Sequence, residues 1–264
     1  MKHHMKGKIV VVTGATSGIG EAAAYRFAGM GARVVCVARR KSAAFDSVCA
    51  DLTDETQVQA AVDEIIAAYG RVDILINNAG GGISGPVEDA APADVRRLFD
   101  LNFFGALCMI RAVLPHMRKQ GRGVIINVSS VAAEFAIPFQ AFYSASKAAL
   151  SSLSEALRCE VSPFGIHVSC VLPGDVKTAF TASRQKSIAG AAYGDRAARA
   201  VAAMERDERR GMPPEKVAKA IAAVAKRRDP PVKKVVGAKY KCFVLLARLL
   251  PSRLINCILA KMYG

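Results

Sequence analysis

The stretch Thr13-Gly14-Ala15-Thr16-Ser17-Gly18-Ile19-Gly20 decides the fold, because it joins an apolar run at 8–12 to a stretch of helical composition at 19–30. Glycines at a strand-to-helix turn let the backbone approach a pyrophosphate, and the N–H groups of the helix N-terminus attract the anion. The spacing is Gly-x-x-x-Gly-x-Gly rather than the Gly-x-Gly-x-x-Gly of other dinucleotide-binding folds. A tight turn explains the glycines alone nearly as well, but their position after the first strand favours a nucleotide site.

Apolar runs and helical patterns alternate along the rest of the chain. The apolar runs predict strands at 8–12, 33–38, 47–50, 72–76, 123–128, 166–172 and 232–236. Helical patterns fall at 19–30, 54–69, 92–119, 141–163 and 215–226, and the third is interrupted near Asn102 and Gly105. Strands separated by helices of ten or more residues imply βαβ units. We therefore expect an α/β fold, a Rossmann-type doubly wound parallel sheet with helices on both faces.

Length and composition favour one domain over residues 1–264. The chain is 52% hydrophobic, which suffices for one sizeable core, and no linker or repeat divides it. Between Arg40 and Asp51 there is room only for a short loop or one helical turn. Residues 178–211 are Ala-rich and charged and predict a mobile helical insertion on the ligand side.

The net charge of +15 is concentrated in the C-terminal part. Residues 226–264 hold ten Lys/Arg and one acid, and 240–264 form a basic amphipathic tail with Leu254, Ile255, Ile258, Leu259 and Met262 on one helical face. A basic tail suits nucleic acid, an anionic membrane surface, an acidic substrate or simply solvent. We expect no nucleic acid, and Pro251 and its basic neighbours exclude a spanning helix. For the tail, the alternatives that remain are peripheral membrane contact and docking on the domain or on a second subunit.

The seven cysteines form no Cys-x-x-Cys pair, which is typical of buried free thiols in a reducing compartment. No His/Cys spacing suits a structural zinc site, so we expect no metal. The short, basic segment 1–8 is not a secretory signal. We expect a cytoplasmic protein that is peripheral to the membrane if the tail binds lipid.

Ala38-Arg39-Arg40 ends the second predicted strand and indicates which nucleotide binds. An acidic residue there would accept hydrogen bonds from the ribose 2′-OH of NAD. Arg39 and Arg40 instead match the oxygens of a 2′-phosphate. The sequence therefore favours NADP(H), and the alternative is that both side chains are surface charge.

Tyr143-Ser144-Ala145-Ser146-Lys147 opens the long predicted helix and indicates acid/base chemistry. Tyr143 and Lys147 are four residues apart and share a helix face. The lysine ammonium is expected to lower the phenol pKa from roughly 10 toward working pH. Such a tyrosine protonates a carbonyl during reduction. Ser129 and Ser130 end the preceding strand, where a hydroxyl reaches the substrate oxygen.

Taken together these motifs resemble the short-chain dehydrogenase/reductase family over nearly the whole chain. The turn at 13–20 looks like its cofactor turn, and Asn77-Asn78-Ala79-Gly80 matches its Asn-Asn-Ala-Gly signature. Asn102 and Ser130, thirteen residues before Tyr143, also match, and Pro173-Gly174 followed by Thr178 matches the family's nicotinamide-side motif. The short segment after Arg40 resembles the branch that includes 17β-hydroxysteroid dehydrogenases and retinol-type reductases.

The resemblance implies a role for each matched residue. Tyr143 would be the general acid/base, Lys147 would depress its pKa and hold the nicotinamide ribose, and Ser130 would orient the substrate oxygen. Asn102 would hold a water that links Lys147 to solvent. The implied cofactor-binding residues are Gly14, Thr16, Ser17, Gly18, Ile19, Gly20, Arg39, Arg40, Asp51, Leu52, Asn78, Ala79, Gly80, Tyr143, Lys147, Pro173, Gly174, Val176 and Thr178.

An apolar ketone or secondary alcohol, such as a hydroxysteroid, is the expected substrate. Phe135, Phe139 and Phe142, with Ser130, would form its wall, and each phenylalanine has core packing as its alternative. Seven Lys/Arg in the insertion leave an anionic substrate group open. Family members are commonly homodimers or homotetramers. The competing hypothesis is a nucleotide sensor that binds membrane or nucleic acid through its tail, although a pure binder has no need of Ser130, Tyr143 and Lys147.

Overall fold

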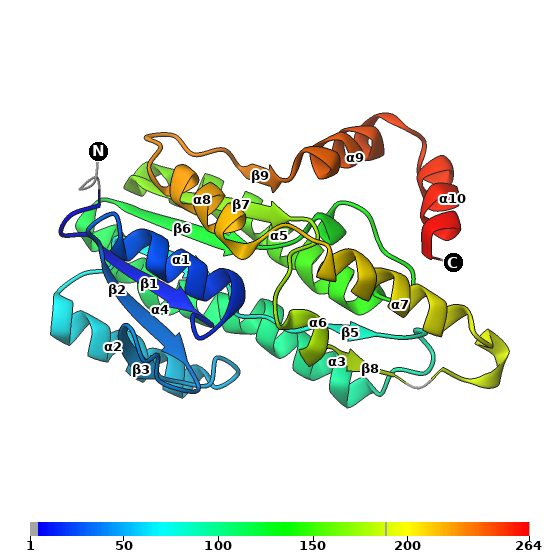
Figure 1. Ribbon diagram of the computed structural model, residues 1–264. Coiled ribbons are helices and arrows are strands. Elements are labelled where there is room, and N and C mark those ends of the chain that lie inside the picture. Colours follow the sequence, from blue (N-terminus) through cyan, green and yellow to red (C-terminus); the bar gives the residue numbers. More distant parts are fainter. Residues whose placement is uncertain (1–4, 188, 264) are drawn as a thin grey trace.

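The structure is a computed structural model that describes residues 5–187 and 189–263. A seven-stranded parallel sheet forms its centre (Figure 1). In spatial order the strands are β3 (Asp46–Cys49), β2 (Arg33–Ala38), β1 (Ile9–Thr13), β4 (Ile74–Asn77), β6 (Gly123–Val128), β7 (Ile166–Pro173) and β9 (Lys233–Val236). The predicted doubly wound α/β fold is confirmed, and the strand and helix ends lie within two residues of the predicted ones.

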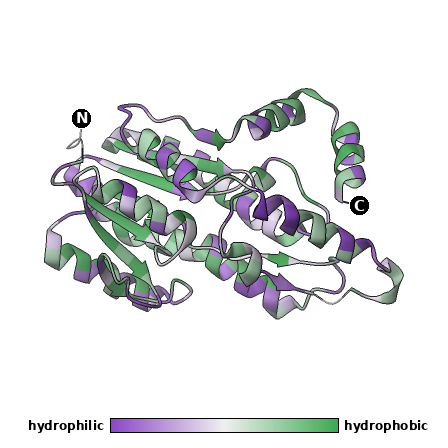
Figure 2. Ribbon diagram, viewed as in Figure 1, coloured by the Kyte–Doolittle hydropathy of each residue, from purple (hydrophilic) through white to green (hydrophobic). Residues whose placement is uncertain are grey.

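The strand order reverses at β1, which pairs with β2 on one side and β4 on the other. Val11 is in register with Val35 of β2 and Leu75 of β4, and all three side chains are buried. Strands covered on both faces are apolar along their length, as Figure 2 shows for the middle of this sheet. Ligands of such sheets bind beyond the carboxyl ends of the strands at this reversal.

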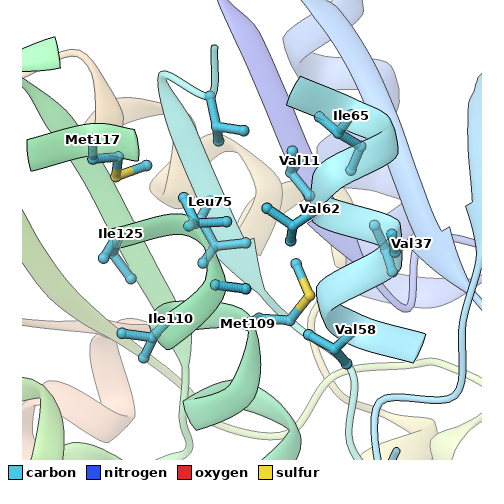
Figure 3. Close-up of a cluster of buried hydrophobic side chains, with 14 of the residues drawn as sticks. Val11, Val37, Val58, Val62, Ile65, Leu75, Met109, Ile110, Met117 and Ile125 are labelled. Atoms are coloured by element: carbon cyan, nitrogen blue, oxygen red, sulfur yellow. The ribbon is translucent and has the colours of Figure 1, made fainter. Parts of the chain in front are cut away.

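Helices cover both faces of the sheet. On one face lie α2 (Glu55–Tyr69), α4 (Gly105–Gln120) and α5 (Ala141–Val161), whose apolar sides form the core drawn in Figure 3 with Val62, Leu75 and Met109 near its centre. On the other lie α1 (Gly18–Ala28) and α8 (Pro214–Ala225), packed around Phe27 and Ile221. Asp54 caps α2, since its carboxylate accepts from the N–H groups of Thr56 and Gln57.

The third predicted helix is broken where the sequence indicated. It consists of α3 (Pro92–Phe99), one π-helical turn over Asp100–Phe104 that contains Asn102, and α4. The run Pro92–Gln120 is long and apolar enough to cross a membrane by length and composition alone. Met109, Val113 and Met117 of this run are fully buried, which is the pattern of a core helix. The segment after Arg40 contains no helix before β3 begins, as its length required.

The insertion at 178–211 is helical only in part. It contains α6 (Phe180–Ser183), β8 (Gln185–Lys186), a 3-10 turn (Ala191–Tyr193) and α7 (Arg196–Arg209). β8 pairs with β5 (Ile83–Ser84), so part of the insertion is a second small sheet. The tail forms α9 (Ala238–Leu249) and α10 (Ser252–Tyr263), and α10 packs against α7 beside the end of the chain (Figure 1).

Candidate active site

The glycine turn lies at the carboxyl end of β1, and its glycines are required by close packing. Gly14 has φ of 65°, and a β-carbon there would lie 2.9 Å from Ala79 Cα. Gly18 has φ of 58° and faces Thr178, whose Cβ lies 3.3 Å from the place of a Gly18 β-carbon. Both glycines thus adopt the left-handed region that L side chains avoid. The turn, expected to hold the pyrophosphate, and the segment after β7, expected to bind the nicotinamide side of the same cofactor, therefore touch.

The Thr13 hydroxyl ties the turn to the loop after β4. It accepts hydrogen bonds from the backbone N–H groups of Asn78, at 2.9 Å, and Ala79, at 3.1 Å. The Asn78 side-chain amide donates back to the carbonyls of Thr13, at 3.1 Å, and Gly14, at 3.3 Å. Asn78 thus shapes the turn. Thr13 was not among the expected site residues, because a threonine ending a strand carries no functional signal by itself.

The start of α1 fits a diphosphate. Ser17 precedes the helix in an extended conformation, and its side chain makes no capping hydrogen bond. The first N–H groups of α1 are therefore not satisfied by their own cap, and Thr16, Ser17, Ile19 and Gly20 surround them. Because these N–H groups are free to bind an anion, the glycine turn and the start of α1 suit the diphosphate of a dinucleotide.

The expected adenosine-side residues lie at the ends of β2 and β3. Arg39 and Arg40 are exposed, and neither is in an ion pair among the described residues. The Asp51 carboxylate accepts from the Thr53 N–H at 3.0 Å and the Thr53 hydroxyl at 2.8 Å, which lowers the Asp51 pKa. Leu52 is buried and touches Gly105 at the start of α4. Its side chain is thus part of the core.

Asn102 holds the loop after β4 from within the π-helical turn. Its side-chain oxygen accepts from the Gly81 N–H at 2.8 Å, and its amide donates to the Gly81 carbonyl at 3.1 Å and the Ser146 hydroxyl at 3.0 Å. Asn102 is buried. A π-turn inserts one extra residue into a helix and is frequent at functional sites. Here the turn directs the Asn102 amide toward the loop after β4 and toward α5 together.

Lys147 is buried and lies close to the loop after β4 that contains Gly80. Its Nζ donates to the Val128 carbonyl at 3.0 Å and lies 6.0 Å from the centroid of the Tyr143 ring. A β-carbon on Gly80 would lie 3.3 Å from that Nζ. Burial lowers the pKa of Lys147 to about 8.

Tyr143 lies in the first turn of α5 beneath Phe180. The two ring centroids are 5.5 Å apart. Burial raises the pKa of Tyr143 to about 12, and a hydrogen bond with Ser130 opposes that rise. Lys147 instead bonds to Val128, so lowering of the tyrosine pKa by the ammonium stays a prediction for a state in which the two groups meet. Ser130 also accepts from the Ala132 N–H at 3.1 Å.

Comparison with known proteins identifies the family. A family profile described as short chain dehydrogenase matches residues 8–189. The chain is 42% identical to the 3-ketodihydrosphingosine reductase of Bacteroides thetaiotaomicron over 239 residues, which cover 88% of this chain and 89% of that protein. The chain is a short-chain dehydrogenase. It is also 36% identical to dehydrogenase/reductase SDR family member 7B of Xenopus tropicalis, over 85% and 76% of the two chains.

Solved structures of other short-chain dehydrogenases share this fold. One from Streptomyces avermitilis has a TM-score of 0.84 and 31% identity, and the match covers 96% of this chain and 95% of that one. The 3-ketoacyl-(acyl-carrier-protein) reductase of Brucella melitensis, complexed with NADH, has a TM-score of 0.73 and 31% identity over 87% and 95% of the chains. A metagenomic short-chain oxidoreductase in complex with NADP has a TM-score of 0.70 and 28% identity over 88% and 98%.

Membership of this family confirms the reaction class predicted from the motifs. This short-chain dehydrogenase is an oxidoreductase that interconverts a ketone and an alcohol with a nicotinamide cofactor. Neither curated relative described above is named as a hydroxysteroid dehydrogenase, and the finer resemblance to that branch is not confirmed.

The lid of this dehydrogenase, defined as residues 178–187 and 189–211, is held by a buried ion pair that the sequence did not indicate. Arg184 and Glu208 form a salt bridge, and the Thr181 hydroxyl donates to the same carboxylate at 2.8 Å. The Arg184 guanidinium also lies 5.4 Å from the centroid of the Phe180 ring. The ion pair thus helps to hold the Phe180 ring in its position against the Tyr143 ring. No part of this arrangement is visible in the spacing of the residues.

The expected nicotinamide-side residues meet the tail. Tyr240 of α9 packs on Gly174, where a β-carbon would fall within the tyrosine ring, and its hydroxyl donates to the Asp175 carboxylate. Val176 bridges to Met212, and the Thr178 hydroxyl accepts from the Phe180 N–H at 3.2 Å. The tail therefore braces the segment that follows Pro173, and docking on the domain was one of the alternatives that the sequence left open for it.

Only some of the expected substrate residues line a pocket. Phe139 borders an apolar cavity of about 250 Å³ that is lined by Pro86, Val87, Pro138, Phe139, Tyr193, Arg196 and Ala260. Phe142 is half-buried next to Tyr143. Phe135 does not line this cavity and is only partly buried, packed against the cluster that contains Leu172, Tyr240 and Val244. No group of three or more His, Cys, Asp or Glu suited to a metal ion occurs within residues 5–187 and 189–263.

Proposed function

We propose that this protein reduces the ketone of a long-chain, lipid-like substrate to a secondary alcohol with NADPH. One observation carries the proposal: the chain is 42% identical, over nearly the full length of both proteins, to a 3-ketodihydrosphingosine reductase. That substrate joins a ketone to a long apolar chain.

The apolar cavity supports a lipid-like substrate. Its walls are apolar side chains with one basic residue, Arg196, and Val87 at its rim is 58% exposed. Phe139 is held there with φ of 60°, a conformation unusual for a non-glycine residue, and its carbonyl accepts from the Gly85 N–H at 2.8 Å. An alkyl chain along these side chains would gain about 0.8 kcal/mol per buried methylene.

The side chains around Tyr143 suit reduction of a carbonyl. The nicotinamide, when bound, supplies the hydride to the carbonyl carbon. Tyr143 gives its proton to the carbonyl oxygen, and Ser130 donates a hydrogen bond to that oxygen and holds it in place. Lys147 holds the ribose and keeps positive charge near the phenolate that forms. Asn102 keeps the Gly81 loop and the Ser146 end of α5 in a fixed relation.

NADP(H) is the proposed cofactor because β2 ends in basic rather than acidic side chains. Arg39 and Arg40 are exposed beyond the strand, where the 2′-phosphate of a cofactor seated on the glycine turn would lie. The Asp51 carboxylate is already engaged by Thr53. Two unpaired guanidinium groups suit a phosphate and offer a ribose hydroxyl no acceptor.

The test is turnover of NADPH by the purified full chain with three ketones. These are 3-ketodihydrosphingosine, a steroid ketone and a short ketone without an alkyl chain. We expect kcat/KM for the long-chain ketone to exceed the other two at least tenfold, and Tyr143→Phe to abolish turnover. A higher kcat/KM for the steroid ketone would instead favour the hydroxysteroid substrate that the sequence suggested. No turnover of any ketone or alcohol would favour the nucleotide sensor.

A further inference from the structure

The helix α9 turns an apolar face outward. At 100° per residue, Cys242, Leu245, Leu246 and Leu249 fall within an arc of about 100°. All four are exposed, and Leu249 is 71% and Leu245 57% accessible to solvent. Tyr240 and Val244 lie on the opposite side and are buried. A surface helix of a globular protein has the reverse pattern, with polar residues outside.

Exposed apolar side chains are concentrated in this part of the molecule. Of the eleven large apolar side chains that are exposed among residues 5–187 and 189–263, six lie in α9 and α10, namely Phe243, Leu245, Leu246, Leu249, Leu254 and Met262. Figure 2 shows the hydrophobic colour over much of both helices. Contiguous exposed apolar surface of this kind marks an interaction site.

Positive charge borders the apolar face. Lys241 and Lys239 lie at its two edges, and Arg253 and Lys261 follow in α10. No Asp or Glu occurs from residue 230 to the end of the sequence. Lys239 pairs with Asp175 at 3.6 Å, whereas Lys241, Arg253 and Lys261 have no acidic partner among the described residues. Apolar side chains flanked by lysines match the headgroup region of an anionic bilayer.

We propose that the outer face of α9, defined as Cys242, Leu245, Leu246 and Leu249 with Lys241 at its edge, docks on the surface of an anionic lipid bilayer. The leucines enter the region of the acyl chains and the lysine stays among the headgroups. The buried side of α9 keeps its contacts with the domain, so docking requires no unfolding of the tail.

Docking brings the pocket close to lipid. Ala260 of α10 lines the apolar cavity beside Phe139, so the tail that carries the docking face also borders the cavity. A lipid ketone dissolved in the bilayer then meets the pocket without crossing water. This last step rests on the proposed lipid-like substrate, but the docking itself does not.

The test is flotation of the purified full chain with vesicles of phosphatidylcholine alone or mixed with phosphatidylglycerol. We expect wild type to float with the mixed vesicles and at least tenfold less with phosphatidylcholine alone. Leu249→Asp should lower the bound fraction at least tenfold, and Lys241→Glu should lower it severalfold and weaken its salt dependence. Phe164→Asp is the matched control, because Phe164 is 44% exposed in the turn before β7. It should float as wild type does.

Three results would overturn the proposal. They are absence of wild type from the mixed vesicles, equal binding of Leu249→Asp and wild type, and equal loss of binding with Phe164→Asp. Sedimentation velocity separates the main alternative. If Leu249→Asp yields a smaller species while wild type ignores both vesicles, the face belongs to a second copy of this chain. Turnover of a short soluble ketone by Leu249→Asp should equal that of wild type, so failed docking and a wrong substrate are distinguishable.

Discussion

The ring of Tyr240 lies directly on Gly174, in the space that a β-carbon at residue 174 would occupy. The same tyrosine donates its hydroxyl to Asp175, and burial raises its pKa. A residue of the tail thus fixes the segment expected to hold the nicotinamide.

Gly174→Ala should therefore destabilise the protein by about 1–3 kcal/mol through overpacking. The kcat/KM of the folded variant should also fall, because the displaced segment is the one expected to hold the nicotinamide. Thermal unfolding and kcat/KM measure the two effects. Tyr240→Ala in the Gly174→Ala background should restore part of the stability, and additive losses in the double variant would contradict the packing argument.

Phe180→Ala should lower the pKa of Tyr143 from about 12 toward its ordinary value near 10. The Phe180 ring is one of the groups that exclude water from the phenol, and desolvation is the main cause of the raised pKa. Loss of the proton then begins at lower pH, so the alkaline limb of the rate profile for reduction moves down.

This pKa is measured by titrating tyrosinate absorbance with pH in Phe180→Ala and in Phe180→Ala/Tyr143→Phe. The difference between the two titrations belongs to Tyr143. The conservative variant Phe180→Leu, which keeps an apolar cover, serves as the control and should retain most of the shift. An unchanged Tyr143 pKa in Phe180→Ala would show that other groups exclude the water.

Arg184→Met should destabilise the lid, because it leaves Glu208 buried without its partner. Removing one member of a buried ion pair costs about 3–5 kcal/mol. Burial already raises the Glu208 pKa, so loss of Arg184 should raise it further and make the variant more stable at low pH than at high pH. Urea unfolding at two pH values measures the effect.

The double variant Arg184→Met/Glu208→Leu should recover much of this loss, since neither charge is then left unpaired. Arg209→Met is the surface control, because its pair with Glu205 is exposed on the arginine side and should contribute about 0–1 kcal/mol. Equal losses at both positions would mean that burial of the Arg184 pair has no energetic consequence.

Arg39→Ala should raise KM for NADPH about ten- to hundredfold and leave KM for NADH within about twofold. A hydrogen bond to a charged group contributes about 1.5–3 kcal/mol. The variant loses this bond to the 2′-phosphate of NADPH, whereas NADH has no 2′-phosphate and is unaffected. Arg40→Ala measures the share of the neighbouring guanidinium. Equal effects on both cofactors would contradict the NADP(H) proposal.

The sequence predicted what depends on local pattern. The break around Asn102 was visible because a polar residue and Gly105 interrupt an apolar helix, and the structure confirms it as a π-turn. The shared face of Tyr143 and Lys147 follows from helical spacing alone. The strands followed from buried β-branched runs between glycines.

What failed depends on contacts between distant segments. Phe135 was expected in the pocket but does not line the cavity, and it is partly buried against the cluster that contains Tyr240 and Val244 of the tail. Phe180, Arg184 and Glu208 lie 37, 41 and 65 residues after Tyr143, and only the folded chain brings Phe180 onto Tyr143 and Arg184 onto Glu208. Helical periodicity of the tail showed an apolar face but not which side would turn outward.

The bonds of Thr13 have a consequence for the order of events during folding. Its hydroxyl is fixed by amides 65 and 66 residues further along the chain, so the turn takes its shape only after β4 has paired with β1. Contacts so distant in sequence form slowly, because a long loop must close first. A dinucleotide that binds only the finished turn would act as a chaperone-like ligand, trapping each newly made chain that has completed its central strand pair and raising the yield of native enzyme in cells rich in that nucleotide.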